Sequence, residues 1–240
     1  MNSRPARQLV EIEITNLVAG TMLSAGVTVA AARSDVEQLR LQCQRENAVA
    51  CTELAYRHYF GDGVPRNSES AAVLNRRACR LGEPVGCNNL GVIFKRAGAL
   101  SQATDFYQRA CDEGDMVACT NLGIVYAEGQ GLAIDKGRAE SLWRRACDAG
   151  NARSCAYLGG IYDAGEGGTS NGAEAARLYG LALNIARTGC SGGDAWNCDA
   201  LGELYEKGWG VQQDSAEAAR LFRRACADGN LESCDRLGSW

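Results

Sequence analysis

The feature that most constrains this chain is a pair of cysteines eight positions apart, which recurs six times. These pairs take up all twelve cysteines of the 240 residues: Cys43/Cys51, Cys79/Cys87, Cys111/Cys119, Cys147/Cys155, Cys190/Cys198 and Cys226/Cys234. A spacing that returns at regular intervals indicates internal repetition, which is the signature of a repeat array. A single irregular helical bundle is the alternative reading.

Each repeat opens with one amphipathic pattern. After the second cysteine of a pair come a leucine, a small residue and a ring at offsets +3, +4 and +7, as in Cys119, Leu122, Gly123 and Tyr126. On a helix these offsets share one face. Glycine costs a helix about 1 kcal/mol relative to alanine. Its recurrence at +4 therefore predicts that another helix approaches closely there.

A second pattern closes each repeat. An alanine stands eight before the next cysteine, an aromatic residue four before it and a glycine three after it, as in Ala139, Trp143, Cys147 and Gly150. Glycine suits the left-handed position that ends a helix, and the Asp or Asn that follows can cap the next one. We therefore predict hairpins of helix A, turn and helix B that stack into a superhelix.

These patterns divide the chain as follows. Residues 1–32 form a separate N-terminal segment, and residues 33–240 form the repeats. The predicted pieces are a helix remnant at 35–46, repeats at 47–82, 83–114, 115–150, 151–193 and 194–229, and a half repeat at 230–240.

The consensus A-C-x-x-L-G-x-x-Y-x-x-G-x-G, followed by A-x-x-x-W-x-x-A-C-x-x-G, is carried almost whole by residues 118–150. It resembles the Sel1-like repeat, a relative of the tetratricopeptide repeat. The cysteine pairing is similar to that of the secreted cysteine-rich Sel1-like family first described from Helicobacter. The resemblance covers about residues 35–240 and implies an all-α, right-handed α/α superhelical solenoid. Repeat 83–114 departs by lacking the G-x-G turn, and His58 departs by replacing the ring.

We predict that every cysteine pair is a disulfide. Within one helix, residues eight apart lie about 12 Å apart, which is beyond the roughly 7 Å that a disulfide spans between Cα atoms. Gly114, however, breaks the helix between Cys111 and Cys119, so that two helical turns come side by side. Structural zinc prefers closer pairs that converge in fours. Reduced, packed cysteines are the other alternative.

The repeat at 151–193 departs from the regular position of the first cysteine. In 151–193 the expected cysteine position holds Leu183, and Cys190 follows seven residues later. Seven residues are nearly two helical turns, so Cys190 returns to almost the same face. We predict a helix B lengthened by two turns, or alternatively a loop before Cys190.

Export is expected from the cysteines and the N-terminus. Disulfides persist in oxidising compartments. Residues 1–32 contain an uncharged run at 15–32 that ends in a small-residue pattern, typical of a signal peptide or a marginal membrane anchor. Glu11 and Glu13 do not fit a basic leader. We expect a periplasmic or secreted protein; the alternatives are the mitochondrial intermembrane space and the cytoplasm.

Motifs for catalysis are few. HExxH, the phosphate-binding P-loop and G-x-G-x-x-G are absent, and we expect no metal and no cofactor. His58 is the only histidine and stands in a core register. Two G-x-S-x-G matches, at 168–172 and 189–193, lack the preceding strand of a hydrolase elbow. The family resemblance implies a β-lactam-binding or β-lactamase-type hydrolase as an alternative, but S-x-x-K, S-D-N and K-T-G are all missing.

Binding is the function that we expect. Offsets +2, +5 and +9 of helix A face away from the cysteine stripe and predict a peptide- or protein-binding face. The candidate residues are Tyr56, Asn89, Arg96, Asn121, Ile124, Tyr157 and Glu203. Alternatively, Ile124 and Tyr157 pack on the next helix A. The arginine pairs on helix B, such as Arg144-Arg145, are interpreted as a solvated face.

Net charge bounds the partners. At −4 it implies neither nucleic acid nor an anionic membrane surface, so that the membrane enters only through a possible N-terminal anchor. The sequence therefore predicts an exported, disulfide-stapled scaffold that binds a protein or peptide.

Overall fold

The computed structural model describes residues 35–130, 132–165, 171–228 and 230–238. The predicted signal or anchor at 1–32 lies outside these residues. The chain divides into two compact units, of which unit 1 ends at Glu83 and unit 2 begins at Pro84. In the described part of the chain, no helix combines the length and the apolar character that crossing a membrane requires.

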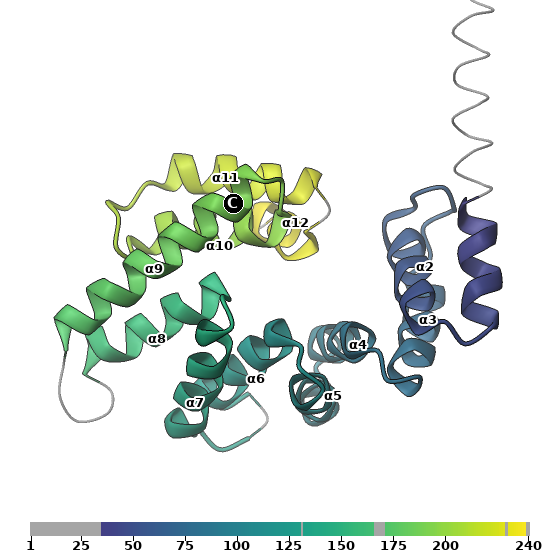
Figure 1. The fold of residues 1–240 in the computed structure, drawn as a ribbon, viewed down its shortest axis with the longest axis horizontal. Coiled ribbons are helices and arrows are strands. Elements are labelled where there is room, and N and C mark those ends of the chain that lie inside the picture. Colours follow the sequence, from purple (N-terminus) through teal and green to yellow (C-terminus); the bar gives the residue numbers. More distant parts are fainter. Residues whose placement is uncertain (1–34, 131, 166–170, 229, 239–240) are drawn as a thin grey trace, which may run out of the picture. The chain divides into compact units, whose positions relative to one another are not determined.

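Both units consist of helix hairpins (Figure 1). In unit 1 a helical segment at 35–44 precedes α2 (Ala48–Phe60) and α3 (Ser68–Arg80). Unit 2 contains α4 (Pro84–Arg96), α5 (Leu100–Asp112), α6 (Met116–Glu128), α7 (Lys136–Asp148), α8 (Ala152–Ala164), α9 (Gly172–Ser191), α10 (Ala195–Lys207), α11 (Ser215–Ala227) and α12 (Leu231–Gly238). The even-numbered helices are the A helices of the repeats and the odd-numbered ones are the B helices.

The junction between repeats is built as the sequence predicts. Helix α5 ends just before Gly114, whose φ of +99° is the left-handed conformation that glycine adopts readily. Asp115 then caps α6, because its side chain accepts hydrogen bonds from the backbone N–H groups of Val117 and Ala118. The chain thus ends one helix and starts the next within a few residues.

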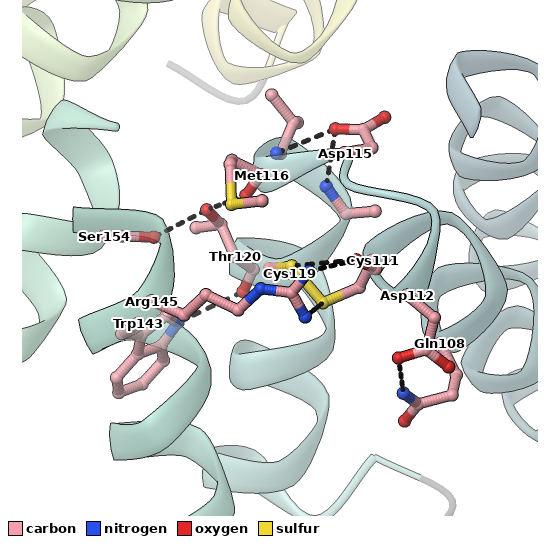
Figure 2. The surroundings of a disulfide bond; sticks show 12 residues. Gln108, Cys111, Asp112, Asp115, Met116, Cys119, Thr120, Trp143, Arg145 and Ser154 are labelled. Atoms are coloured by element: carbon pink, nitrogen blue, oxygen red, sulfur yellow. Dashed lines mark hydrogen bonds between the residues drawn. A yellow bond between two sulfur atoms is a disulfide. The ribbon is translucent and has the colours of Figure 1, made fainter. Parts of the chain in front are cut away.

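Disulfides cross these junctions. The described bonds join Cys43–Cys51, Cys111–Cys119, Cys147–Cys155, Cys190–Cys198 and Cys226–Cys234, with Cα atoms 4.5 to 4.8 Å apart. Figure 2 shows Cys111–Cys119 between the end of α5 and the start of α6. Cys79 and Cys87 are also disulfide-bonded, and none of the cysteines is free. Each described bond ties a helix B to the helix A of the following repeat.

The recurrent glycine of helix A marks close helix contact, as predicted. A Cβ atom added to Gly123 would lie 2.3 Å from Nε1 of the buried Trp143. The indole Nε1–H of Trp143 donates a hydrogen bond to the carbonyl oxygen of Thr120 at 3.1 Å, so the ring packs directly on the backbone of α6. The same packing joins Gly91 with Tyr107, Gly159 with Tyr179 and Gly202 with Phe222.

Helix α9 confirms the prediction for the fourth repeat. It has 20 residues, whereas the other helix B elements have 13, and it stays helical through Cys190. Leu183 and Cys190 are both buried, which places them on the same face two turns apart. The alternative of a loop before Cys190 is wrong.

Both arginines of the pair on α7 are exposed, as interpreted, and Arg144 is balanced by Glu140 of the same helix at 2.7 Å, but the pair also makes contacts with other repeats. Arg144 donates to the Tyr162 hydroxyl of the next repeat at 2.6 Å. Arg145 donates to the carbonyl oxygen of Cys111, at the end of the preceding helix B, at 3.0 Å (Figure 2). Cations at helix C-termini satisfy carbonyls that have no partner within the helix. The pair therefore links its repeat to the neighbours on both sides.

Candidate ligand-binding face

A hollow of about 200 Å³ lies where three consecutive A helices of unit 2 begin. We call it the unit-2 hollow. It is lined by Val117, Thr120 and Asn121 of α6, by 150–153 around the start of α8, and by Asp194, Trp196, Asn197, Asp199 and Ala200 around the start of α10. The repeat sets this lining, since Val117, Arg153 and Trp196 all stand two residues before the second cysteine of a pair.

The helix caps position the rim of this hollow. Asn151 accepts a hydrogen bond from the N–H of Ser154, and Asp194 accepts from the N–H groups of Trp196 and Asn197. These caps fix the first turns of α8 and α10. Trp196 stands two residues after its cap Asp194 and is 50% exposed, so that a large aromatic ring stands at the edge of the hollow.

Beneath the rim lies a buried arginine that joins three repeats. The guanidinium of Arg153 contacts Asp199 and Glu203 of α10 and Glu232 of α12, each at 2.8 Å. Arg153, Asp199 and Glu203 are all less than 10% exposed. Such a planar fork can hold several carboxylates at once. One side chain of α8 therefore reaches both of the following A helices.

A second arginine shares the same carboxylates. Arg236 of α12 lies 3.6 Å from Glu203 and 3.4 Å from Glu206, and the hydroxyl of Tyr157 donates to Glu203 at 2.8 Å. The cluster thus contains four carboxylates, those of Asp199, Glu203, Glu206 and Glu232, against two guanidinium groups. Its formal charge is negative.

The pKa values of the acidic side chains show how burial and ion pairing compete in this cluster. Desolvation by the surrounding side chains opposes ionisation, but Arg153 attracts the charged form and lowers the pKa of Glu232 to about 2. Burial likewise opposes the charge of Glu203, yet Arg153 and Arg236 lower its pKa. For Asp199 burial prevails and its pKa is raised, although Arg153 pulls in the other direction.

Polar pairs also join adjacent A helices beside the hollow. Between α6 and α8, the hydroxyl oxygens of Thr120 and Ser154 lie 2.6 Å apart. Between α10 and α12, the Ser233 hydroxyl donates a hydrogen bond to Asp199. Thr120 and Asp199 both follow the second cysteine of a pair, whereas Ser154 and Ser233 both precede it. Equivalent positions of the repeat therefore join one A helix to the next.

The structure places the predicted binding residues of unit 2 in different surroundings. Asn121 lines the hollow, where its amide donates to the Asn88 side chain at 3.0 Å. Ile124 packs against the core, and the Tyr157 ring stacks on Trp143 with centroids 5.0 Å apart. Glu203 is 5% exposed and engaged by Arg153. Asn121 thus lies at the hollow, while Tyr157 and Glu203 support it from below.

The other three predicted residues lie elsewhere. Asn89 and Arg96 belong to α4, where Asn89 is half-buried and Arg96 is exposed. Tyr56 belongs to α2 of unit 1, is 41% exposed and packs its ring on Phe60 with centroids 4.3 Å apart. These residues do not line the unit-2 hollow.

Two residues of the hollow, Arg153 and Trp196, are not among the predicted binding residues. Both stand at offset −2, four positions before the offset +2 that the prediction used, and residues four apart share a helix face. This shared helix face is the one signal in the sequence by which Arg153 and Trp196 could have been predicted. The partners of Arg153 were harder to find, because they lie 46, 50 and 79 residues further along the chain.

The fold and the hollow together indicate the general class of this protein. Helix hairpins in tandem, with polar and aromatic residues of the A helices around a shallow hollow, are typical of helical-repeat scaffolds. The Sel1 repeat family matches the chain at 48–83, 84–115, 117–151, 152–184 and 198–230. The chain belongs to the Sel1 repeat family.

Solved structures show the same fold. The chain is similar to c5321, a protective antigen of uropathogenic Escherichia coli with an SLR fold, at 25% identity and a TM-score of 0.58; the match covers 85% of this chain and 51% of that one. It thus spans about half the length of that protein. A Sel1 repeat protein from Oxalobacter formigenes matches at 24% identity and a TM-score of 0.59, covering 90% and 88%.

The cysteine-rich protein B of Helicobacter pylori is also similar, at 26% identity and a TM-score of 0.32, with 58% of this chain and 95% of that one covered. No curated protein matches the chain.

Proposed function

We propose that this protein is an exported scaffold that binds a protein or peptide through the unit-2 hollow. The observation that carries the proposal is the hollow itself, which three consecutive A helices line and at whose rim Trp196 stands half exposed. Binding hot spots are enriched in tryptophan, tyrosine and arginine. The polar pairs and the Arg153 cluster hold the surface in place before a partner arrives, which lowers the ordering cost of binding.

Export is the second part of the proposal. The disulfides indicate an oxidising, extracytoplasmic compartment. We propose the bacterial periplasm or the extracellular medium, with residues 1–32 as the leader or anchor. Fusing residues 1–40 to a periplasmically active phosphatase would test this: activity in whole cells is expected, and activity confined to lysates would contradict it.

The binding proposal is tested by selecting peptides from a random displayed library on the oxidised full chain and measuring their affinity by calorimetry. Replacing Trp196 by alanine should weaken the selected peptides at least about tenfold, as expected for a hot-spot residue. The matched control is Ile134→Ala, because Ile134 is a large apolar residue of unit 2 that is 62% exposed and does not line the hollow. Equal losses in both variants, or in neither, would contradict the proposal.

The hydrolase alternative has a direct test of its own. Purified oxidised protein is incubated with the chromogenic β-lactam nitrocefin. We expect no turnover, since the sequence lacks the motifs of serine β-lactamases. Turnover at an enzymatic rate that persists through repurification and is lost on mutation would overturn the scaffold proposal in favour of catalysis.

A further inference from the structure

Unit 1 contains a hollow of its own, of about 530 Å³. We call it the unit-1 hollow. Its walls come from the helical segment 35–44, from α2 and from α3. Its volume lies in the range of about 300–1,000 Å³ that small-molecule and peptide side-chain sites occupy. All of its lining residues belong to unit 1, so this site is separate from the unit-2 hollow.

Two buried polar atoms of the lining have no hydrogen-bond partner among the described residues. They are Nδ1 of His58 and Nε of Arg77. A buried donor or acceptor without a partner is costly, and such groups in folded proteins call for an explanation. Two of them on one hollow indicate a ligand that both could contact.

The repeat pattern shows that His58 is out of the ordinary. It occupies the ring position of helix A, where Tyr126, Tyr162 and Tyr205 stand in later repeats. Each of those three hydroxyls accepts a hydrogen bond from an arginine, at 3.2, 2.6 and 3.3 Å respectively. In unit 1 the ring position carries an imidazole instead, and its buried nitrogen is left without that partner.

Arg77 can be compared with its counterpart in the same way. Arg145 stands in the same register of helix B, two residues before the first cysteine of a pair. Both arginines donate to a backbone carbonyl at the end of the helix that stands one repeat earlier, Arg77 to Gln44 at 3.1 Å and Arg145 to Cys111 at 3.0 Å. Arg77 therefore has a structural anchor through one terminal nitrogen, while its Nε–H remains to be satisfied.

The remaining lining suggests the chemistry of the ligand. Three arginines, Arg40, Arg77 and Arg80, face one glutamate, Glu69, and Arg40 is ion-paired with Glu37 at 2.9 Å. The wall also contains apolar surface from Leu54, Val73 and Leu74, and Val73 is 56% exposed. A basic hollow with an apolar wall is complementary to a molecule that has one anionic end and one apolar end.

We propose that the unit-1 hollow binds an organic carboxylate with a short apolar body. The carboxylate would accept hydrogen bonds from His58 and from the Nε–H of Arg77, which are charge-assisted and therefore strong. The apolar body would lie on Leu54, Val73 and Leu74. Both a small free acid and the C-terminus of a peptide that ends in an apolar residue have this chemistry.

The chain provides its own reporter for this site. His58 is the only histidine of the 240 residues, so the imidazole region of a long-range ¹⁵N–¹H spectrum of the full chain contains a single ring. Adding hexanoate should shift the nitrogen and carbon-bound proton signals of that ring in a saturable way. Hexylamine and hexanol should leave them unchanged at the same concentration. An equal response to hexanol, or no response to hexanoate, would overturn the proposal.

Variants test the two proposed donors. Replacing His58 by phenylalanine, the residue at the same position in the next repeat, should weaken hexanoate binding about tenfold in ligand-observed NMR, as for loss of a charged hydrogen bond. Arg77→Lys should keep the charge, lose the Nε–H and weaken binding as well. The control Tyr126→Phe alters the ring position in unit 2 and should change nothing. Undiminished binding in either unit-1 variant, with folding confirmed by circular dichroism, would contradict the proposal.

The source of the carboxylate is decided by a further pair of probes. N-acetyl-Gly-Leu is compared as the free acid and as the amide. A free acid that binds more tightly than hexanoate identifies a peptide C-terminus, and one that binds no better identifies a small acid. Binding of the amide equal to that of the acid would overturn the role of the carboxylate.

Discussion

The two hollows are built from the same repeat, yet they treat their charged groups in opposite ways. At the unit-2 hollow, Arg153 is engaged by three carboxylates and further braced by its neighbours. At the unit-1 hollow, one terminal nitrogen of Arg77 donates a hydrogen bond to a backbone carbonyl. Neither the Nε of Arg77 nor the Nδ1 of His58 has a hydrogen-bond partner among the described residues. In the first, charges stabilise the scaffold; in the second, they remain available to a ligand.

This difference shows how a repeat protein can acquire distinct sites without changing its fold. The hydrophobic and glycine positions of each hairpin are fixed by packing, whereas the residues of the exposed registers are free to vary. Different registers of the same hairpin thus provide an internal ion-pair network in unit 2 and unmet hydrogen bonds in unit 1. The two ends of this chain can therefore be tested against each other.

The largest expected effect comes from removing Arg153. Arg153→Met should lower the free energy of unfolding of unit 2 by about 3–5 kcal/mol, because it leaves the buried Asp199 and Glu203 with only the more distant Arg236 as countercharge. Arg77→Met should cost only about 1 kcal/mol, the value of one hydrogen bond. Urea denaturation followed by circular dichroism measures both. Similar losses in the two variants would break the comparison.

Next in size are the disulfides, which should affect the two ends alike. Replacing both cysteines of Cys43–Cys51 or of Cys226–Cys234 by serine should cost about 2–3 kcal/mol in either case, since each bond closes a loop of the same length. Chemical denaturation gives the values. Non-reducing digestion and mass spectrometry of the parent should identify six linked pairs, including the predicted Cys79–Cys87; free thiols would contradict the prediction.

Acid should weaken unit 2 selectively. Because the pKa of Glu232 is depressed in the folded state to about 2, its contribution is fully present above its unfolded pKa of about 4.5 and is lost as the pH falls toward 2. Its side chain is 43% exposed, so that after solvent screening we expect about 1–2 kcal/mol. Glu232→Gln should make the melting temperature depend less steeply on pH across this range. An unchanged slope would remove Glu232 from the acid response.

The smallest effect on stability is expected at the rim. Trp196 is half exposed, so Trp196→Ala should change the free energy of unfolding by less than about 0.5 kcal/mol while weakening the selected peptides. Thermal and urea denaturation measure the first quantity and calorimetry the second. A large loss of stability would show that Trp196 supports the fold rather than a partner.

Much of the fold could be predicted because its determinants lie close together in the sequence. The glycine before Asp115, the leucine and ring spacing and the extra two turns before Cys190 are all local patterns that packing then respects. The contact of Gly123 with Trp143 could also be predicted, because glycine destabilises a helix and yet recurs at this position of helix A.

The candidate sites could be predicted only in part. A helix face can be read from periodicity, but whether Glu203 meets solvent or Arg153 depends on a repeat 50 residues away. The roles of Arg144 and Arg145 were missed for the same reason, since their partners lie 18 and 34 residues away in other repeats. The register of His58 favours a core residue, and only the structure reveals that its buried Nδ1 atom has no hydrogen-bond partner among the described residues.

The position of the disulfides has a consequence for proteolysis. Each described bond spans the turn between repeats, where a protease would find the exposed backbone between two helices. A cut between Cys111 and Cys119, at Asp112 or Glu113 for example, would leave the two fragments covalently joined, because the bond bridges the cut. The chain can therefore be nicked at these turns without being divided, and its pieces separate only after reduction.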